Sequence, residues 1–143
     1  MLSPSLEDYL EELYRFSLQT ETVRVTDVGN KLHVSLPSVT KALHKLRAEQ
    51  YIRYQRYGEI ELTDKGRELG NFLVKRNHLL QEFLRLICSN CDIAAEAEAI
   101  EHYLSPATIT AIQTLVGFMK ANPDCYQSFV QFLGESELNK PQL

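Results

Sequence analysis

The chain has 143 residues, 44% of them hydrophobic, which is enough to build a sizeable core in one compact domain or two small ones. The net charge is −4 and is uneven, because residues 1–75 carry 11 Lys/Arg and 11 Asp/Glu whereas residues 76–143 carry 4 and 8. The sequence has no apolar run near the roughly 18 residues of a membrane span and no signal peptide at its start. We therefore expect a cytoplasmic protein without a membrane partner. The overall charge does not suggest nucleic-acid binding, although a local basic surface in the first half could still provide it.

An amphipathic helix is predicted over residues 3–18, with Ser3 as its cap and Pro4 in its first turn. Asp8 and Glu11 lie three residues apart, on a different face from the apolar stripe. Acids are favoured near the start of a helix, which accounts for Asp8, although Glu11 lies too far along for this explanation. From this helix alone, ordinary surface charge is the favoured interpretation of both.

Two short helices joined by a tight turn follow, one from a cap at Thr26 to Leu32 and one from a cap at Ser35 to about Ala48. This order is the helix-turn-helix pattern. The exposed face of the second helix combines small and hydroxyl residues, which allow close approach to bases, with lysines that can meet phosphates. An ordinary solvated helix face is the alternative. The candidate DNA contacts on this helix are Ser35, Pro37, Ser38, Thr40, Lys41 and Lys45.

A β-hairpin is predicted next, because residues 51–57 and 59–63 alternate with a period of two around a turn at Gly58. A helix-turn-helix followed by a hairpin is a winged helix, and this order favours DNA binding over the solvated-face alternative. Arg53, Arg56 and Tyr57 lie at or near the predicted wing tip, where phosphate or minor-groove contacts would fall.

A long helix is predicted from a cap at Thr63 or Asp64 to about Ile87, and its apolar face is too wide for a lone surface helix. We expect it to pack against the C-terminal helices and against a second subunit. Further helices are predicted over 93–104, from Ser105 to about 121, and from a cap at Asp124 to Gly134, before a frayed polar tail. The predicted fold class is mainly α: a winged helix-turn-helix with a two-stranded wing, then an all-helical dimerisation domain.

Three cysteines, Cys88, Cys91 and Cys125, form an odd set without a secretion signal, which favours reduced thiols. Cys88 and Cys91 have the spacing of half a zinc site or of a redox pair. Because no second pair exists in the sequence, a structural or incidental role is favoured over zinc or redox chemistry.

Glu98, Glu101 and His102 lie at positions i, i+3 and i+4 of a predicted helix and therefore share one face. Two carboxylates and an imidazole make half of a divalent-metal site. This donor set suits manganese or ferrous iron better than a metal that prefers thiolates. A solvated acidic helix face is the alternative for this pentapeptide taken alone.

Five motifs occur in a fixed order along the chain: Pro4 to Glu11, Ser38 to Leu46, Leu62 to Gly66, Leu79 to Leu84 and Glu98 to Ser105. Through these motifs the chain resembles the diphtheria-toxin-repressor family of metalloregulators, and within it the manganese-sensing branch, over about residues 3–133. The resemblance implies a DNA-binding domain, which we place at residues 1–70, and a metal-binding and dimerisation domain at residues 71–143. It also implies a metal-activated repressor of metal-uptake genes that binds a palindromic double-stranded DNA operator as a homodimer, with neither enzymatic activity nor a small-molecule substrate.

The resemblance also implies a set of metal ligands, which are Asp8, Glu11, Glu98, Glu101 and His102. The iron-sensing branch has a cysteine in place of Glu98 and a methionine in place of Asp8. The acids found here therefore favour Mn(II), with one or two ions per subunit, and Fe(II) or Zn(II) as alternatives.

One departure from the family concerns the long helix, where the family pattern is Arg-His-x-Leu with a Glu four residues after the His. This chain has Arg76, Asn77, His78 and Leu79, followed by Glu82, so that the His and the Glu both come one place late. Either Asn77 fills the ligand position and His78 points about 100° away, or a local shift of the helix brings His78 in as a ligand.

We expect metal to bridge the first helix and the second domain, and so to fix the separation of the two recognition helices of a dimer near one DNA turn, about 34 Å. A repressor that senses another metal, an organic ligand or thiol redox state is the main alternative. A hydrolytic metalloenzyme is disfavoured, because the sequence carries no nucleophile or oxyanion motif.

Overall fold

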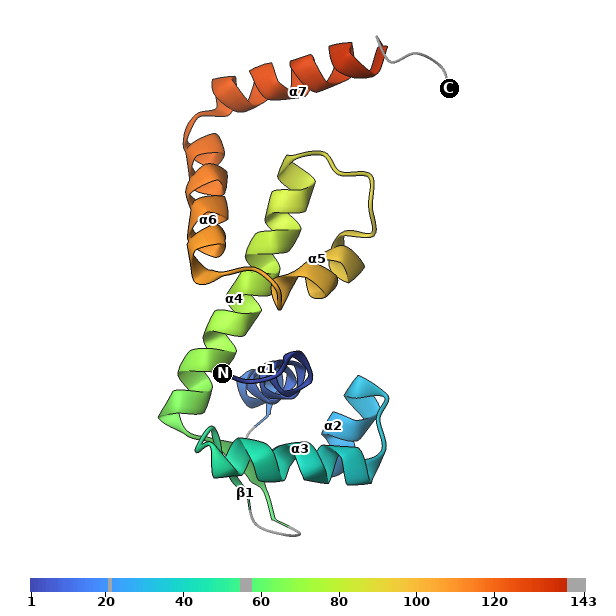
Figure 1. The fold of residues 1–143 in the computed structure, drawn as a ribbon, viewed down its shortest axis with the longest axis vertical. Coiled ribbons are helices and arrows are strands. Elements are labelled where there is room, and N and C mark those ends of the chain that lie inside the picture. Colours follow the sequence, from blue (N-terminus) through green and yellow to red (C-terminus); the bar gives the residue numbers. More distant parts are fainter. Residues whose placement is uncertain (21, 55–57, 139–143) are drawn as a thin grey trace. The chain divides into compact units, whose positions relative to one another are not determined.

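The computed structural model of the chain describes residues 1–20, 22–54 and 58–138. It divides into two compact units, Met1–Lys75 and Arg76–Leu143. The predicted mainly α architecture with one two-stranded sheet is confirmed (Figure 1). In chain order the elements are α1 (Pro4–Gln19), α2 (Val25–Leu32), α3 (Leu36–Ala48), β1 (Ile52–Tyr54), β2 (Ile60–Leu62), α4 (Asp64–Leu86), α5 (Ile93–Glu101), α6 (Pro106–Ala121) and α7 (Pro123–Leu138).

Serine caps begin three of the helices: α1 at Ser3 and α3 at Ser35, as predicted, and α6 at Ser105, where the sequence predicted a helix start. Each serine Oγ accepts a hydrogen bond from the backbone N–H three residues later, at 3.4, 3.3 and 3.2 Å respectively. A proline in the first turn of each helix needs no hydrogen-bond acceptor there. Thr63 caps α4 in the same way, since its Oγ1 accepts a hydrogen bond from the Gly66 N–H at 3.1 Å.

Four predicted helix boundaries are wrong. The helix α7 begins at Pro123, so that Asp124 lies in its first turn and is not its cap. The helix α2 begins at Val25 rather than after Thr26, because the Asp27 carboxylate accepts a hydrogen bond from the Arg24 N–H at 2.9 Å and so caps an earlier start. The helix α5 ends at Glu101 rather than near 104. The helix α7 continues through Gly134, where glycine costs a helix only about 1 kcal/mol and does not by itself end it.

The first unit has its own core, in which α1, α2 and α3 pack together and the hairpin closes one side (Figure 1). The strands are antiparallel, with Ile52 opposite Leu62 and Tyr54 opposite Ile60. These four side chains are buried, whereas Arg53 between them is exposed. The hairpin therefore contributes one face to the core and presents the other to solvent, as its period of two predicts.

The second unit has a separate core, formed by the C-terminal half of α4 together with α5 and α6. Leu80, Leu84, Ala97 and Ile109 are its buried centre. The helix α7 is tied to α4 by the Tyr126 hydroxyl, which donates a hydrogen bond to the Leu86 carbonyl at 3.0 Å. Among the described residues, none of the helices is both long and apolar enough to cross a lipid bilayer.

Gly66 permits a close backbone approach between α4 and the start of the hairpin. A Cβ at this position would lie 2.0 Å from the Tyr51 carbonyl oxygen. That carbonyl is held in place, since it accepts hydrogen bonds from the Thr63 N–H at 3.1 Å and from the Thr63 hydroxyl at 3.0 Å. The absence of a side chain at residue 66 is therefore required for the hairpin to join α4.

We expect Gly66→Ala to lower the free energy of unfolding by about 1–3 kcal/mol, because the new methyl group overlaps a fixed backbone oxygen. Gly134→Ala is the matched control, since a Cβ at this helical glycine meets nothing within 4 Å. It should leave stability unchanged or raise it by up to about 1 kcal/mol. Urea unfolding followed by circular dichroism measures both, and equal effects of the two substitutions would contradict the steric explanation.

Candidate functional site

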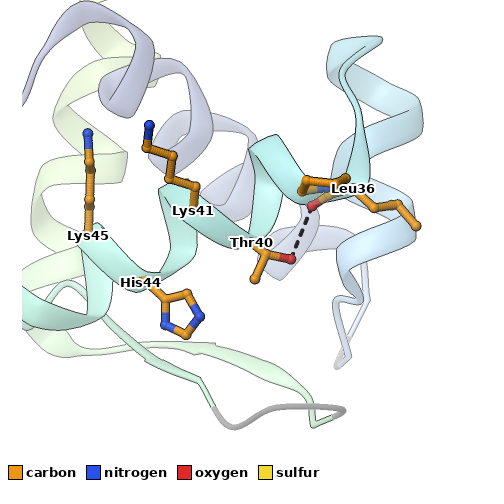
Figure 2. A pocket seen from close by; sticks show the side chains of 6 residues that line it. Leu36, Thr40, Lys41, His44 and Lys45 are labelled. Atoms are coloured by element: carbon orange, nitrogen blue, oxygen red, sulfur yellow. Dashed lines mark hydrogen bonds between the residues drawn. The ribbon is translucent and has the colours of Figure 1, made fainter.

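The exposed face of α3 is the candidate DNA interface. Ser35, Pro37, Ser38, Lys41 and Lys45 are exposed. Thr40 is half-buried, and its hydroxyl donates a hydrogen bond to the Leu36 carbonyl at 3.0 Å. A shallow groove runs along this helix (Figure 2), and the residues that line it are Leu36, Pro37, Thr40, Lys41, His44 and Lys45.

The two lysines of α3 extend from one side of the helix, one turn apart, while Thr40 and His44 project from another side (Figure 2). Side chains four residues apart on a helix are neighbours, so Lys41 and Lys45 form a short cationic row. Such a row can meet phosphate groups, while the small residues at the start of the helix leave room for base edges.

The hairpin is attached to α3 by several contacts. The Arg47 guanidinium donates a hydrogen bond to the Tyr54 carbonyl at 3.1 Å. The His44 ring packs edge-on against the Tyr54 ring, with 6.0 Å between the ring centroids. These contacts hold the wing in a fixed relation to the candidate recognition helix. Arg53 is exposed on β1. Arg56 and Tyr57, the other predicted wing contacts, lie outside the described residues.

The candidate metal ligands of the second unit lie at the end of α5. Glu101 is the last residue of the helix and is buried, and His102 is its cap and is half-buried. The Glu101 Oε1 and the His102 Nε2 are 3.8 Å apart. Glu98 lies one turn earlier and is exposed. The structure therefore brings together a carboxylate oxygen and an imidazole nitrogen, which are the two donor types predicted for this face.

Asn77, and not His78, faces this cluster. The Asn77 amide nitrogen donates a hydrogen bond to the Glu101 Oε2 at 3.1 Å, and Asn77 is 8% exposed. His78 is exposed. Since α4 keeps a regular helical register with Leu80 and Leu84 in the core, no local shift brings His78 toward Glu101. The structure therefore places Asn77, rather than His78, on the side of α4 that faces Glu101.

Arg76, which the sequence analysis named as part of the family motif but not as a site residue, also belongs to this cluster. It is buried, with its guanidinium Nη2 at 3.4 Å from the His102 Nδ1 and its Nε at 4.0 Å from the Glu101 Oε2. A positive charge beside a buried carboxylate partly offsets the cost of its burial. The signal in the sequence that points to Arg76 is the family pattern Arg-His-x-Leu, in which Arg76 matches the arginine.

The candidate ligands of the first unit lie on α1. Asp8 is half-buried, and Glu11 is buried and paired with Arg15, the Oε1 and Nη2 being 2.6 Å apart. Burial raises the pKa of the neighbouring Glu12 above its usual range, an effect that Lys31 and Arg15 partly oppose. This helix therefore places several carboxylates close together, with Arg15 paired to Glu11.

The three cysteines all lie in the described part of the chain, and each has a free thiol. Cys88 and Cys125 are exposed, and Cys91 is half-buried. The Cys88 Sγ lies 3.9 Å from the Tyr126 hydroxyl. A zinc or redox role for Cys88 and Cys91 stays an alternative that this geometry does not favour over an incidental one.

Both halves of the sequence match known family descriptions. Residues 1–60 match the N-terminal DNA-binding domain of iron-dependent repressors, and residues 63–129 match their metal-binding and dimerisation domain. A curated relative from Lysinibacillus sphaericus, the HTH-type transcriptional regulator MntR, is 41% identical over 125 residues, which cover 87% of this chain and 90% of the relative. The chain belongs to the diphtheria-toxin-repressor family.

Further relatives agree with this assignment. The HTH-type transcriptional regulator MntR of Listeria monocytogenes is 36% identical over 143 residues, or 99% of this chain and 98% of the relative. The solved structure of the manganese regulator SloR is 27% identical, with a TM-score of 0.71, over 82% of this chain and 55% of that one. This diphtheria-toxin-repressor family member thus spans about half the length of that solved chain.

Family membership makes the chain a DNA-binding transcriptional regulator with a dimerisation domain, and confirms the prediction that it is not an enzyme. The two candidate sites fall in different matched regions. The face of α3 lies in the DNA-binding match, and the cluster around Glu101 lies in the match that binds metal and dimerises.

We expect Lys41→Ala and Lys45→Ala each to weaken binding to any duplex DNA by a similar factor and to lower the slope of log affinity against log salt by about 1, as loss of one phosphate contact would. Fluorescence anisotropy over a series of salt concentrations, at constant divalent-metal concentration, measures this. Lys120→Ala is the control, because Lys120 lies in the other unit and pairs with Glu82 at 2.5 Å. An unchanged slope in both α3 variants would remove these lysines from the interface.

Proposed function

We propose that this chain is a manganese-activated repressor of manganese-uptake genes, which binds a palindromic DNA operator as a homodimer. The observation that carries the proposal is the pair of Glu101 Oε1 and His102 Nε2, which are 3.8 Å apart in the region that matches a metal-binding domain. The names of its relatives, HTH-type transcriptional regulator MntR and manganese regulator SloR, support the choice of metal.

The proposed ligands are mainly carboxylates with one imidazole: Asp8, Glu11, Glu98, Glu101 and His102. Oxygen donors with a single nitrogen fit Mn(II) or Fe(II) better than a soft metal. His78, which the sequence left as a candidate ligand, is not in the proposed set because it is exposed while Asn77 faces Glu101. Intrinsic affinity favours zinc and copper over manganese, so selectivity must come from the number and arrangement of these donors.

A divalent ion, when bound, supplies the positive charge that lets carboxylates from both units lie close together. We propose that Asp8 and Glu11 of α1 and the acids of α5 share this role, so that α1 is held to the second domain. In each unit an arginine already offsets part of the charge: Arg15 beside Glu11, and Arg76 beside Glu101. The separation of two recognition helices in a dimer is then fixed near one DNA turn, about 34 Å, and metal and DNA strengthen each other's binding.

The proposed DNA contacts come from the α3 face and the wing. The hydroxyl and small residues at the start of α3 would approach the bases, and the lysines and Arg53 would contact phosphates. The full proposed set is Ser35, Pro37, Ser38, Thr40, Lys41, Lys45 and Arg53, with Arg56 and Tyr57 beyond the described residues.

We expect Mn(II) to raise the affinity of the chain for its operator at least about tenfold, a coupling free energy of about 1.4 kcal/mol. The operator is first selected from a pool of randomised duplexes in the presence of Mn(II), and binding is then measured by mobility shift with and without a chelator. Glu101→Gln should reduce the Mn(II) effect. A complex that forms equally well in the chelator would overturn metal activation.

The same assay separates the alternatives. A response to Fe(II) or Zn(II) at lower free concentrations than Mn(II) would replace manganese by that metal. A response to a thiol oxidant in the chelator would favour a redox sensor acting through Cys88 and Cys91.

We expect Glu98→Cys to shift metal preference toward Zn(II), because a thiolate is a softer donor than a carboxylate. The ratio of Zn(II) to Mn(II) affinity, measured by competition against a chelating dye, should rise at least about tenfold. Glu96→Cys is the matched control, since Glu96 is an exposed acid of the same helix. An equal change in both variants would indicate adventitious thiolate binding and would remove Glu98 from the ligand set.

A further inference from the structure

A row of three polar side chains runs along α4 and ends at Glu101. The Arg85 guanidinium donates a hydrogen bond to the Gln81 Oε1 at 3.1 Å, and the Gln81 amide nitrogen donates to the Asn77 Oδ1 at 2.7 Å. The Asn77 amide nitrogen in turn donates to the Glu101 Oε2 at 3.1 Å. Residues 77, 81 and 85 are spaced by four along the helix, so each side chain meets the next.

The direction of this relay is fixed by its two ends. A guanidinium can only donate hydrogen bonds, and an ionised carboxylate can only accept them. Gln81 must therefore turn its oxygen toward Arg85 and its amide nitrogen toward Asn77. Asn77 must then turn its oxygen toward Gln81 and its nitrogen toward Glu101, so the orientation of both amides follows from chemistry rather than from an arbitrary choice of O and N.

We propose that Asn77 is a positioning residue for the metal ligand Glu101 and not itself a metal ligand. The side-chain oxygen of Asn77, the one atom of this side chain that could bind a cation, accepts the hydrogen bond from Gln81. The side chain turns its amide N–H group toward Glu101, and an amide N–H group does not coordinate a cation. This inference rests on the proposed manganese-dependent function.

The relay also fixes which oxygen of Glu101 lies beside His102. Because Asn77 holds Oε2, the carboxylate presents Oε1 on the side of the His102 Nε2, 3.8 Å away. Partners that orient a ligand typically change metal affinity 10–100-fold when they are removed. The departure of this chain from the family motif thus replaces an imidazole ligand by a group that fixes a neighbouring ligand.

The test measures Mn(II) affinity of the full chain by isothermal titration calorimetry for wild type, Gln81→Leu and Arg85→Met. If Asn77 positions Glu101, Gln81→Leu weakens Mn(II) binding about tenfold, because the Asn77 amide loses its anchor. Arg85→Met should also weaken it, although removing a positive charge would by electrostatics alone favour cation binding. Gln127→Leu is the control, an exposed glutamine of α7 that should leave affinity unchanged.

A second readout is the electron paramagnetic resonance spectrum of Mn(II) at saturation. It should differ between wild type and Gln81→Leu, because the Glu101 carboxylate takes a different orientation, whereas loss of stability alone would leave it unchanged. If Gln81→Leu keeps or tightens Mn(II) binding, the freed Asn77 oxygen is acting as a ligand and the inference is overturned. If wild type itself does not bind Mn(II), the proposed function fails, and the positioning role fails with it.

Discussion

A buried carboxylate at the end of α5 is the constraint on which the second unit depends. Glu101 is 1% exposed, and taking such a group out of water costs several kcal/mol unless it is paired and hydrogen-bonded. The fold meets this demand from α4, with the Asn77 amide at 3.1 Å and the Arg76 guanidinium at 4.0 Å. An apolar residue at position 101 would need neither partner. The polar partners of Glu101 therefore compensate the burial of its carboxylate and do not improve the packing of the core. Such a buried, compensated acid is typical of a binding site.

The first unit is organised around a different requirement, which is to present α3 with its polar face in solvent. The apolar side of α3 is fixed by the core, and its far end is tied to the hairpin through Arg47 and Tyr54. The close contact of Gly66 with the Tyr51 carbonyl lets the next helix begin directly after the hairpin. Contacts between α3 and Tyr54 thus join the described part of the hairpin to the exposed helix face.

Much of this could be predicted from the sequence, because the signals were local. Serine caps followed by proline fixed the starts of α1, α3 and α6, and the alternation of residues 51–63 predicted the hairpin. The ends that were wrong depended on competing local interactions, such as the Asp27 cap, or on the small cost of a glycine within a helix, as at Gly134. The choice between Asn77 and His78 could not be made from the sequence either. That choice depends on which face of α4 packs against α5. The sequence does not determine this face, because the histidine and the glutamate both come one residue later than in the family pattern.

The start of α3 differs from most other helix starts in the chain. The first turns of α1, α2, α4, α5 and α7 carry an acid, whereas the serine-capped first turns of α3 and α6 carry none. Aligned peptide dipoles leave about half a positive charge at the start of a helix, and an acid there would compensate it. In α3 this partial charge is left uncompensated. A polyanion that approaches Ser35 and Ser38 is therefore attracted by the backbone itself, by about 0.3–1 kcal/mol, in addition to any lysine it meets.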